Sequence, residues 1–304
     1  MLDLITLTNC LTDITVEAEE QDLDRLEIQR GITNSPSRIK LKEFYEFIKT
    51  KEKKYFQAGS PGNVAFNSAR QNITTGLFGS VTKDELGKCY VNAVKSAGIK
   101  PFVKVCKGRS GVCYILITPD GERHMVADVG VAGNFDYELN GKKAKIMHTS
   151  GYEVGSNPQG AEKVLDYMKA KGARISFDLA SPRMIQKERE TIERIAGKSD
   201  ILFMTEDEAI ELKNQEPMKT LEEMSEKCEF TILKKGKMGS VVRRGCEQHD
   251  ISVVKVQLVN VCGAGDAYAS GFLAGILKGY SLEDCGMNGS YIASRVCAIE
   301  GSHL

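Results

Sequence analysis

The 304-residue sequence predicts an α/β fold, in which a doubly wound and mostly parallel sheet carries a small additional β lid. Two observations support this prediction. Over most of the chain, short β-branched runs alternate with segments whose apolar residues recur at helical spacing, which is typical of parallel strands joined by helices. Between residues 102 and 131, in contrast, short β runs are separated only by polar turns, which indicates hairpins.

Composition narrows the classes of partner. Lys and Arg together number 41, as do Asp and Glu, so neither a nucleic acid nor an anionic membrane is expected to bind. The nine cysteines include no Cys-x-x-Cys pair and there are only four histidines, which favours reduced thiols over zinc sites or disulfides. The first seven residues lack a basic start, and no apolar run is long enough to span a bilayer. We therefore expect a cytoplasmic protein, either a monomer or a homodimer.

The N-terminal part of the chain brings two polar residues to the end of a strand. Residues 4–7 are predicted to form the strand, and Asn9 and Asp13 follow it. Ligands of open α/β sheets bind at such strand ends, although ordinary turn chemistry explains the same two residues. Segments 22–30 and 40–51 then show the apolar spacing of helices.

A Pro-Gly turn enters the next predicted helix, within residues 57–70. Gly62, Asn63 and Asn67 lie in this segment in that order. Asparagine adopts positive φ more readily than other non-glycine residues, so Asn63 is compatible with a tight turn. Residues 76–87 follow as a strand, a loop and the start of another helix, to which we assign a structural role.

The predicted lid consists of roughly residues 14–34 and 102–134, within a single domain that covers residues 1–304. Its β runs are expected at 102–105, 111–117 and 124–129. Arg123 follows one of the hairpin turns. A lone arginine on a strand commonly faces solvent, but a cation that arrives when a lid closes can also stabilise developing negative charge. Both interpretations of Arg123 remain open.

From residue 144 onward the alternation of strands and helices returns. Strands are expected at 145–149, 173–177 and 201–204, and helices at 157–171 and 185–196. Thr205 and Glu208 have the spacing of a capping box, which explains both residues without a ligand. Residues 230–242 are predicted to form a strand, a glycine turn and a second strand.

The C-terminal part contains the strongest candidate for a functional site. A strand predicted at residues 251–259 leads to the sequence Gly263-Ala264-Gly265-Asp266, and a helix follows as far as Lys278. Two glycines allow a sharp turn, after which the amide groups at the helix N-terminus favour a phosphate group. Asp266 either matches the helix dipole or acts as a base beside that phosphate.

The four residues Gly263-Ala264-Gly265-Asp266 resemble the C-terminal motif of the PfkB carbohydrate kinase family, which has a ribokinase-like fold. Asn260 and Val261 replace the Asp and Thr that commonly precede this motif. The Pro-Gly segment and Asp13 also resemble family elements and appear in the family's order. The two helices before the Pro-Gly turn and the position of Arg123 are most similar to the adenosine-kinase-like branch.

The resemblance implies a role for each candidate residue. Asp266 is the catalytic base, with the Gly263, Ala264 and Gly265 amides and Arg123 stabilising the transferred group. The acceptor is bound by Asp13, Asn9, Gly62, Asn63 and Asn67, and the nucleotide by Lys235, Gly236, Gly239, Gly263, Gly265 and Asn288. Glu208 contributes indirectly to a metal site. The implied cofactors are ATP and Mg²⁺, and participation of K⁺ is left open.

The sequence thus predicts an ATP-dependent kinase that transfers the γ-phosphoryl group to a hydroxymethyl group of an adenosine-like nucleoside or of a sugar. Alternatives are a sugar kinase of the fructokinase or ribokinase type and a non-catalytic ligand-binding relative, since Thr205 and Asn63 depart from the family pattern. Glu153, if it lay beside a purine, would need a hydrogen-bond partner. A dinucleotide oxidoreductase is disfavoured because no Gly-x-Gly-x-x-Gly follows the first strand.

Overall fold

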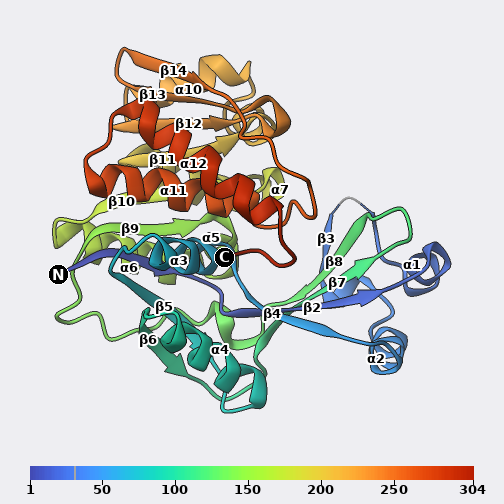
Figure 1. Cartoon of the computed structure of the whole chain (residues 1–304). Coiled ribbons are helices and arrows are strands. Elements are labelled where there is room, and N and C mark those ends of the chain that lie inside the picture. The colour runs from blue at the N-terminus through green and yellow to red at the C-terminus, as the bar shows by residue number, and fades with distance from the viewer. Residues whose placement is uncertain (31) are drawn as a thin grey trace.

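A computed structural model of the chain describes residues 1–30 and 32–304, which form two sheets of different size (Figure 1). The large sheet has nine strands and is parallel except at β13 and β14. In spatial order its strands are β14 (Glu247–Ile251), β13 (Ser240–Arg244), β12 (Phe230–Lys234), β11 (Ile201–Thr205), β10 (Arg174–Asp178), β9 (Ala144–Ser150), β1 (Leu2–Leu7), β5 (Thr75–Val81) and β6 (Lys100–Val105). The predicted fold class is confirmed.

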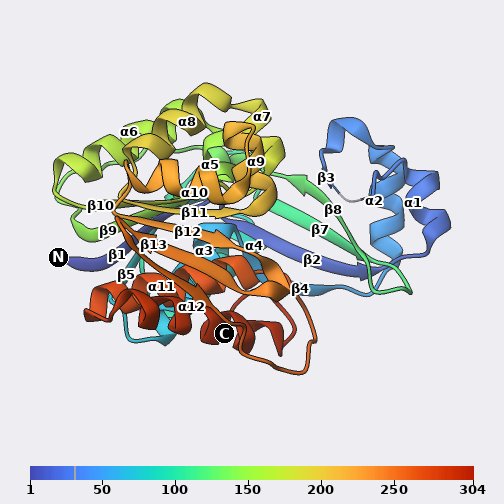
Figure 2. The same cartoon turned by 90° about the horizontal axis from the view of Figure 1, so that it is seen from above.

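Helices cover both faces of this sheet, as Figure 2 shows from above. One face carries α3 (Ser60–Arg70), α4 (Glu85–Ser96), α11 (Ala264–Lys278) and α12 (Leu282–Cys297). The other carries α5 (Gly151–Ser156), α6 (Pro158–Ala170), α7 (Pro182–Lys187), α8 (Arg189–Lys198), α9 (Glu206–Lys213) and α10 (Pro217–Ser225). Buried apolar side chains fill the space between sheet and helices on each side. Within the described residues, no helix is both long and apolar enough to cross a membrane.

The small sheet is the lid, and it projects from one end of the large sheet (Figures 1 and 2). Its order is β3 (Thr33–Asn34), β8 (Arg123–Asp128), β7 (Gly111–Ile117), β2 (Leu11–Glu17) and β4 (Lys54–Ala58). Helices α1 (Glu20–Leu26) and α2 (Leu41–Thr50) cover one of its faces, and short 3-10 turns lie at Pro36–Arg38 and Gly130–Gly133.

The burial pattern of β2 explains how the lid presents a polar face. Thr12, Ile14 and Val16 are buried, and the last two belong to the apolar cluster beneath α1 and α2. Successive side chains of a strand point to opposite faces, so the half-buried Asp13 points away from these helices. One face of the lid sheet therefore packs against α1 and α2 in a small apolar core, and the other face is available to a ligand.

Three details of the predicted organisation need correction. Residues 102–105, expected in the lid, belong to β6, which pairs in parallel with β5 at the edge of the large sheet. The strand expected at residues 251–259 ends at Ile251, since residues 252–259 join neither sheet. The helix expected at 185–196 is divided into α7 and α8. In each case a short β-branched or apolar run is compatible with several structures. The segment that packs or pairs with it decides which one forms, and the local sequence does not specify that segment.

Candidate active site

The carboxyl ends of the parallel strands meet the polar face of the lid, and we call this region the junction. Asp178, Thr205 and Lys234 are the last residues of β10, β11 and β12, which are neighbours in the large sheet. The first turn of α11, with Asp266, lies beside them. Ligands of open α/β sheets bind at such strand ends, so the topology alone marks the junction as the candidate site.

Asp266 is held at the start of α11 by two side chains from α3. The Ser60 hydroxyl donates to Asp266 Oδ1 at 2.7 Å, and Asn63 Nδ2 donates to Oδ2 at 2.8 Å. Burial raises the pKa of Asp266 to about 6, and these two hydrogen bonds oppose the rise. A carboxylate that is fixed in place and has a pKa near neutrality suits a general base.

The turn before Asp266 requires glycine at its first position. Gly263 has φ +75°, and a Cβ added there would lie 2.3 Å from the carbonyl oxygen of Ser302. The Ala264 N–H donates to the Val261 carbonyl at 3.2 Å, whereas the Gly265 N–H lies in the first turn of α11, where backbone N–H groups lack an intrahelical acceptor. This turn can therefore bind an anion next to the carboxylate of Asp266.

Asn63, which is predicted to line the acceptor pocket, also supports Asp266, and its contact with the acceptor stays a prediction. The Ser302 hydroxyl donates to Asn63 Oδ1 at 3.0 Å, which leaves Nδ2 of the same amide to donate to Asp266. No sequence pattern points to Ser302 or Ser60 as partners in this arrangement. Their spacing from Asp266 carries no local pattern, so only the contact of three distant segments reveals them.

Two lid residues approach the same region. Burial raises the pKa of Asp13 to about 7, the negative charge of Asp266 adds to the rise, and Arg123 opposes it. Asp13 and Asp266 are thus close enough to influence each other's ionisation. Arg123 Nη1 donates to the Cys262 thiol sulfur at 2.9 Å, immediately before the Gly263 turn. The lid therefore contacts the anion-binding turn directly.

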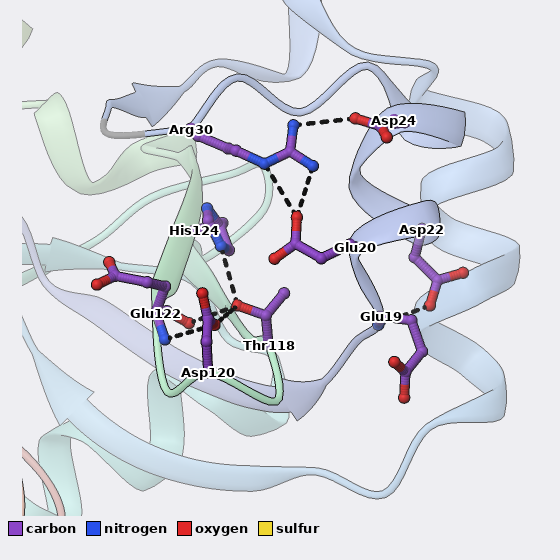
Figure 3. A network of polar contacts seen from close by, with 9 residues as sticks. All are labelled: Glu19, Glu20, Asp22, Asp24, Arg30, Thr118, Asp120, Glu122 and His124. Atoms are coloured by element: carbon purple, nitrogen blue, oxygen red, sulfur yellow. Dashed lines mark hydrogen bonds and ion pairs between the residues drawn. The ribbon is translucent and has the colours of Figure 1, made fainter.

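A polar network fixes the hairpin turn that precedes Arg123 (Figure 3). The Thr118 hydroxyl donates to Asp120 Oδ1 at 2.6 Å and lies 3.2 Å from Nε2 of His124. The same view shows Arg30, whose guanidinium forms ion pairs with Glu20 and Asp24 of α1. The bonds of Thr118 join the two ends of the turn, so the protein itself positions the start of β8 at Arg123.

A buried ion pair crosses the strand ends. Lys234 Nζ lies 2.6 Å from Asp178 Oδ2, with side chains only 13% and 6% exposed, and the pair spans β11. Burial alone would lower the pKa of Lys234, but the carboxylates of Asp178 and Glu208 outweigh it and the pKa is raised. The predicted sites did not include Asp178 or Lys234, although their positions at strand ends were a usable signal.

Glu208 forms the predicted capping box with Thr205. The Thr205 N–H donates to Glu208 Oε2 at 2.8 Å, and the Glu208 N–H donates to the Thr205 hydroxyl at 3.4 Å. Burial raises the pKa of Glu208, and Lys234 opposes the rise. In the described residues, no group of three or more acidic, histidine or cysteine side chains could hold a metal ion. This donor set fits a cation held mainly by phosphates and water, with one or two carboxylates nearby.

Asn9 and Glu153 form a buried connection between β1 and α5. Glu153 Oε1 accepts the Asn9 N–H at 2.9 Å, and Oε2 accepts the Ser150 hydroxyl at 2.5 Å. Burial raises the pKa of Glu153 to about 7. Both carboxyl oxygens are thus satisfied within the protein, and Glu153 needs no ligand as partner. The adjacent Tyr152 is 38% exposed. Its pKa is raised mainly by burial and, to a smaller extent, by the negative charge of Asp266.

Gly62 and Asn67 also have supporting positions. The Gly62 N–H donates to the Thr8 hydroxyl at 3.1 Å, and the buried Asn67 accepts the Leu304 N–H at 2.9 Å through Oδ1. These contacts fasten α3 to the end of β1 and to the C-terminal residues. The acceptor contacts predicted for Asn9, Gly62 and Asn67 stay predictions.

The residues predicted on the nucleotide side fall into two places. Lys235, Gly236 and Gly239 form the turn after β12, where the Lys235 N–H donates to the Gly239 carbonyl at 2.8 Å. This turn lies at the same sheet edge as Lys234. Asn288 lies on α12, and its Nδ2 donates to the Gly271 carbonyl at 2.7 Å. Its amide nitrogen therefore serves the packing of α12 on α11, and its role toward a nucleotide stays a prediction.

Comparisons with known proteins agree with this arrangement. The model of the pfkB family carbohydrate kinases matches residues 32–303. An uncharacterized sugar kinase of Archaeoglobus fulgidus is 27% identical, over 75% of this chain and 92% of its own. The 5-dehydro-2-deoxygluconokinase of Clostridium beijerinckii is 30% identical, over 81% and 79%. The adenosine kinase structure from Sinorhizobium meliloti superposes with a TM-score of 0.88 at 25% identity, covering 100% of this chain and 96% of that one.

Proposed function

Because the chain belongs to the pfkB family of carbohydrate kinases, we propose that Asp266 is the base of an alcohol phosphorylation at the junction. The chain is an ATP-dependent phosphotransferase whose acceptor is an alcohol group of a sugar or a nucleoside. The observation behind the assignment to Asp266 is its position. The carboxylate shares the first turn of α11 with the Gly265 amide and is held by Ser60 and Asn63.

The proposed reaction follows from these contacts. The carboxylate of Asp266 takes the proton of the acceptor hydroxyl, whose oxygen attacks the γ-phosphorus of ATP while the bond to the β-phosphate breaks. The amide of Gly265 and the guanidinium of Arg123 stabilise the negative charge that develops on the transferred group. Glu208 would lie near a bound divalent metal, which we propose is Mg²⁺ and which would neutralise charge on the ATP phosphates.

Asp13 is the proposed grip on the acceptor. It lies on the polar face of the lid, and Asp266 and Arg123 both affect its ionisation. A carboxylate accepts two hydroxyl hydrogen bonds, so it suits the neighbouring hydroxyls of a ribose or another sugar. Asn9 and Asn67 would bind the same acceptor through Asn9 Oδ1 and Asn67 Nδ2. Both atoms are buried and have no hydrogen-bond partner within the described part of the protein.

We propose an adenosine-like nucleoside as the first acceptor to test. The half-exposed ring of Tyr152 lies in the electrostatic environment of Asp266 and offers a surface for a base to stack on. Glu153 presents no obstacle, since its carboxylate is satisfied by Asn9 and Ser150. A sugar is the second candidate acceptor, because the Archaeoglobus fulgidus relative is named a sugar kinase and the Clostridium beijerinckii relative a 5-dehydro-2-deoxygluconokinase.

Two departures from the family pattern bear on the non-catalytic alternative. Asn63 holds Asp266, and Thr205 caps α9 together with Glu208. Both substitutions therefore maintain the geometry of the site, which favours a catalytic protein over a binding relative that has lost its chemistry.

A panel of acceptors tests the proposal. ATP consumption is measured with adenosine, other nucleosides, ribose, fructose and a 2-deoxygluconate, each with Mg²⁺ and with K⁺ or Na⁺ as the monovalent salt. We expect turnover with a nucleoside, with phosphate added to its hydroxymethyl group. Turnover with sugars alone would replace the nucleoside proposal by the sugar one. A difference between K⁺ and Na⁺ would show whether a monovalent cation assists.

A further inference from the structure

Lys234 is the buried cation of the junction that the reaction described above leaves without a task. It is the last residue of β12, and its ammonium crosses the end of β11 to reach Asp178 on β10 at 2.6 Å. Asp178 is itself anchored, because its other carboxyl oxygen accepts the Ala180 N–H at 3.0 Å. The nitrogen of Lys234 is thus held in one place by a fixed partner.

The ammonium lies against the anion-binding turn. A Cβ added to Gly265 would be 3.5 Å from Lys234 Nζ, so the nitrogen lies close to that residue. At the other end of the same turn, Arg123 Nη1 contacts the sulfur of Cys262. The turn from Cys262 to Gly265 is therefore bracketed by two cations, one from the lid and one from the large sheet.

The hydrogen-bonding capacity of Lys234 is mostly unused. An ammonium group carries three N–H donors. Within the part of the chain that the structure describes, Asp178 is the acceptor found for this nitrogen, so two donors are left although the side chain is only 13% exposed. Buried donors without acceptors are costly, which is the condition expected of a group that is completed by a ligand.

The charges of the junction point to an anionic ligand. Asp178, Glu208 and Asp266 place three carboxyl groups around one ammonium, and all three raise the pKa of Lys234 against the effect of burial. A triphosphate cannot approach such a group of carboxylates unless positive charge accompanies it. A metal ion held mainly by phosphates and water supplies part of that charge, and the fixed ammonium supplies the rest.

We propose that Lys234 is a catalytic residue whose ammonium, held by Asp178, donates hydrogen bonds to oxygen atoms of the phosphoryl group that ATP transfers. This inference rests on the proposed function and extends it, since Asp178 becomes a positioning residue. When the bond between the β- and γ-phosphates breaks, the proton of the acceptor hydroxyl goes to Asp266, and Lys234 keeps its own protons. Lys234 stabilises charge and takes no part in proton transfer.

The test separates contact with the γ-phosphate from a purely structural ion pair. Lys234→Met removes the charge, Lys234→Arg retains it, and the double change Lys234→Met/Asp178→Asn removes both charges in case an unpaired Asp178 prevents folding. Lys213→Met is the matched control, because Lys213 forms an ion pair with Glu223 at 2.8 Å on the outer surface of α9. Affinities for ADP and for β,γ-imido-ATP are measured by calorimetry without acceptor, and kcat with the best acceptor of the panel.

We expect Lys234→Met, or the double variant, to lower kcat by about 10²–10³-fold, as loss of one preorganised donor does elsewhere. Affinity for β,γ-imido-ATP should fall at least about tenfold, because a charge-assisted hydrogen bond is lost, with ADP affinity changed less than about twofold. Lys234→Arg should recover part of both losses, and Lys213→Met should change neither. An equal loss of ADP and β,γ-imido-ATP affinity, or unchanged kcat, would overturn the proposal.

Failure of the proposed function would look different. In that case the wild-type protein would consume no ATP with any acceptor of the panel. If the wild type turns over and the charge-free variants do so equally well, the alcohol kinase stands and only the role of Lys234 falls.

Discussion

The two sides of the junction hold their charged groups in different ways. On the large-sheet side, each charged side chain is fixed by the protein: Asp266 by Ser60 and Asn63, and Lys234 by Asp178. On the lid side, the thiol of Cys262 is the one acceptor found for Arg123 among the residues that the structure describes. No hydrogen bond to the carboxylate of Asp13 is found within residues 1–30 and 32–304. The protein itself therefore positions Asp266 and Lys234, but it supplies no such partner for the carboxylate of Asp13.

This difference matches the two tasks of a phosphotransferase. Groups that stabilise a transition state act best when they are oriented in advance, because no reorganisation is then needed as charge develops. Groups that recognise an acceptor keep their hydrogen-bonding capacity for it. We infer that Asp266 and Lys234 on the large-sheet side set the rate of the chemical step and that Asp13 on the lid sets the affinity for the acceptor, which can be tested through kcat and KM.

The largest effect is expected for Asp266→Asn. Loss of the general base should lower kcat by about 10²–10⁴-fold, because the acceptor hydroxyl is no longer deprotonated as it attacks. The KM for the acceptor and the affinity for β,γ-imido-ATP should change little, since asparagine can keep hydrogen bonds to Ser60 and Asn63. Steady-state kinetics at pH 8 and calorimetry provide the measurements.

Asp207→Asn is the control for this prediction. Asp207 lies exposed in the first turn of α9, as Asp266 lies in the first turn of α11, so it tests whether a helix-dipole carboxylate alone matters. The raised pKa of Asp266 also predicts how Asp266→Asn changes the free energy of unfolding. Ionising Asp266 in the folded protein costs free energy, so Asp266→Asn should be more stable than the wild type above about pH 6. This advantage disappears below about pH 4. Equal kcat losses in both variants would contradict the assignment of the base.

A smaller effect, on affinity and not on rate, is expected for Asp13→Asn. The acceptor KM should rise about 10–100-fold, which corresponds to loss of charged hydrogen bonds, while kcat at saturation falls much less. Asp128→Asn serves as the control, since Asp128 is a lid carboxylate that pairs with Arg109 at 3.0 Å. A fall in kcat without a change in KM would show that the division of tasks between lid and large sheet is wrong.

The sequence predicts features that depend on neighbouring residues, and it does not predict contacts between distant ones. The alternation of β-branched and helical segments was sufficient for the parallel sheet, and the Gly263–Asp266 motif was sufficient for the anion-binding turn, because both depend on neighbouring residues. The bonds that orient Asp266 depend on distant residues: Asn63 is 203 positions from Asp266, and Ser302 is 239 positions from Asn63. Residues 102–105 were placed in the wrong sheet for the same reason, since pairing with β5 is not encoded locally.

The smallest predicted effect tests whether orientation of Asp266 from a distance matters. As a base, Asp266 must be ionised, so kcat should fall about tenfold per pH unit below a midpoint near its pKa of about 6. Ser302→Ala removes the donor that orients the amide of Asn63, so the hydrogen bond that lowers the pKa of Asp266 weakens. We expect the midpoint of the pH profile to move to higher pH. At pH 7, kcat should fall less than about fivefold, which corresponds to the free energy of one neutral hydrogen bond.

Ser302→Thr should restore both the midpoint and kcat. Ser294→Ala removes a buried hydroxyl that donates to the Tyr291 carbonyl, and it should leave the pH profile unchanged. A midpoint that moves to lower pH would mean that Ser302 does not act through Asn63.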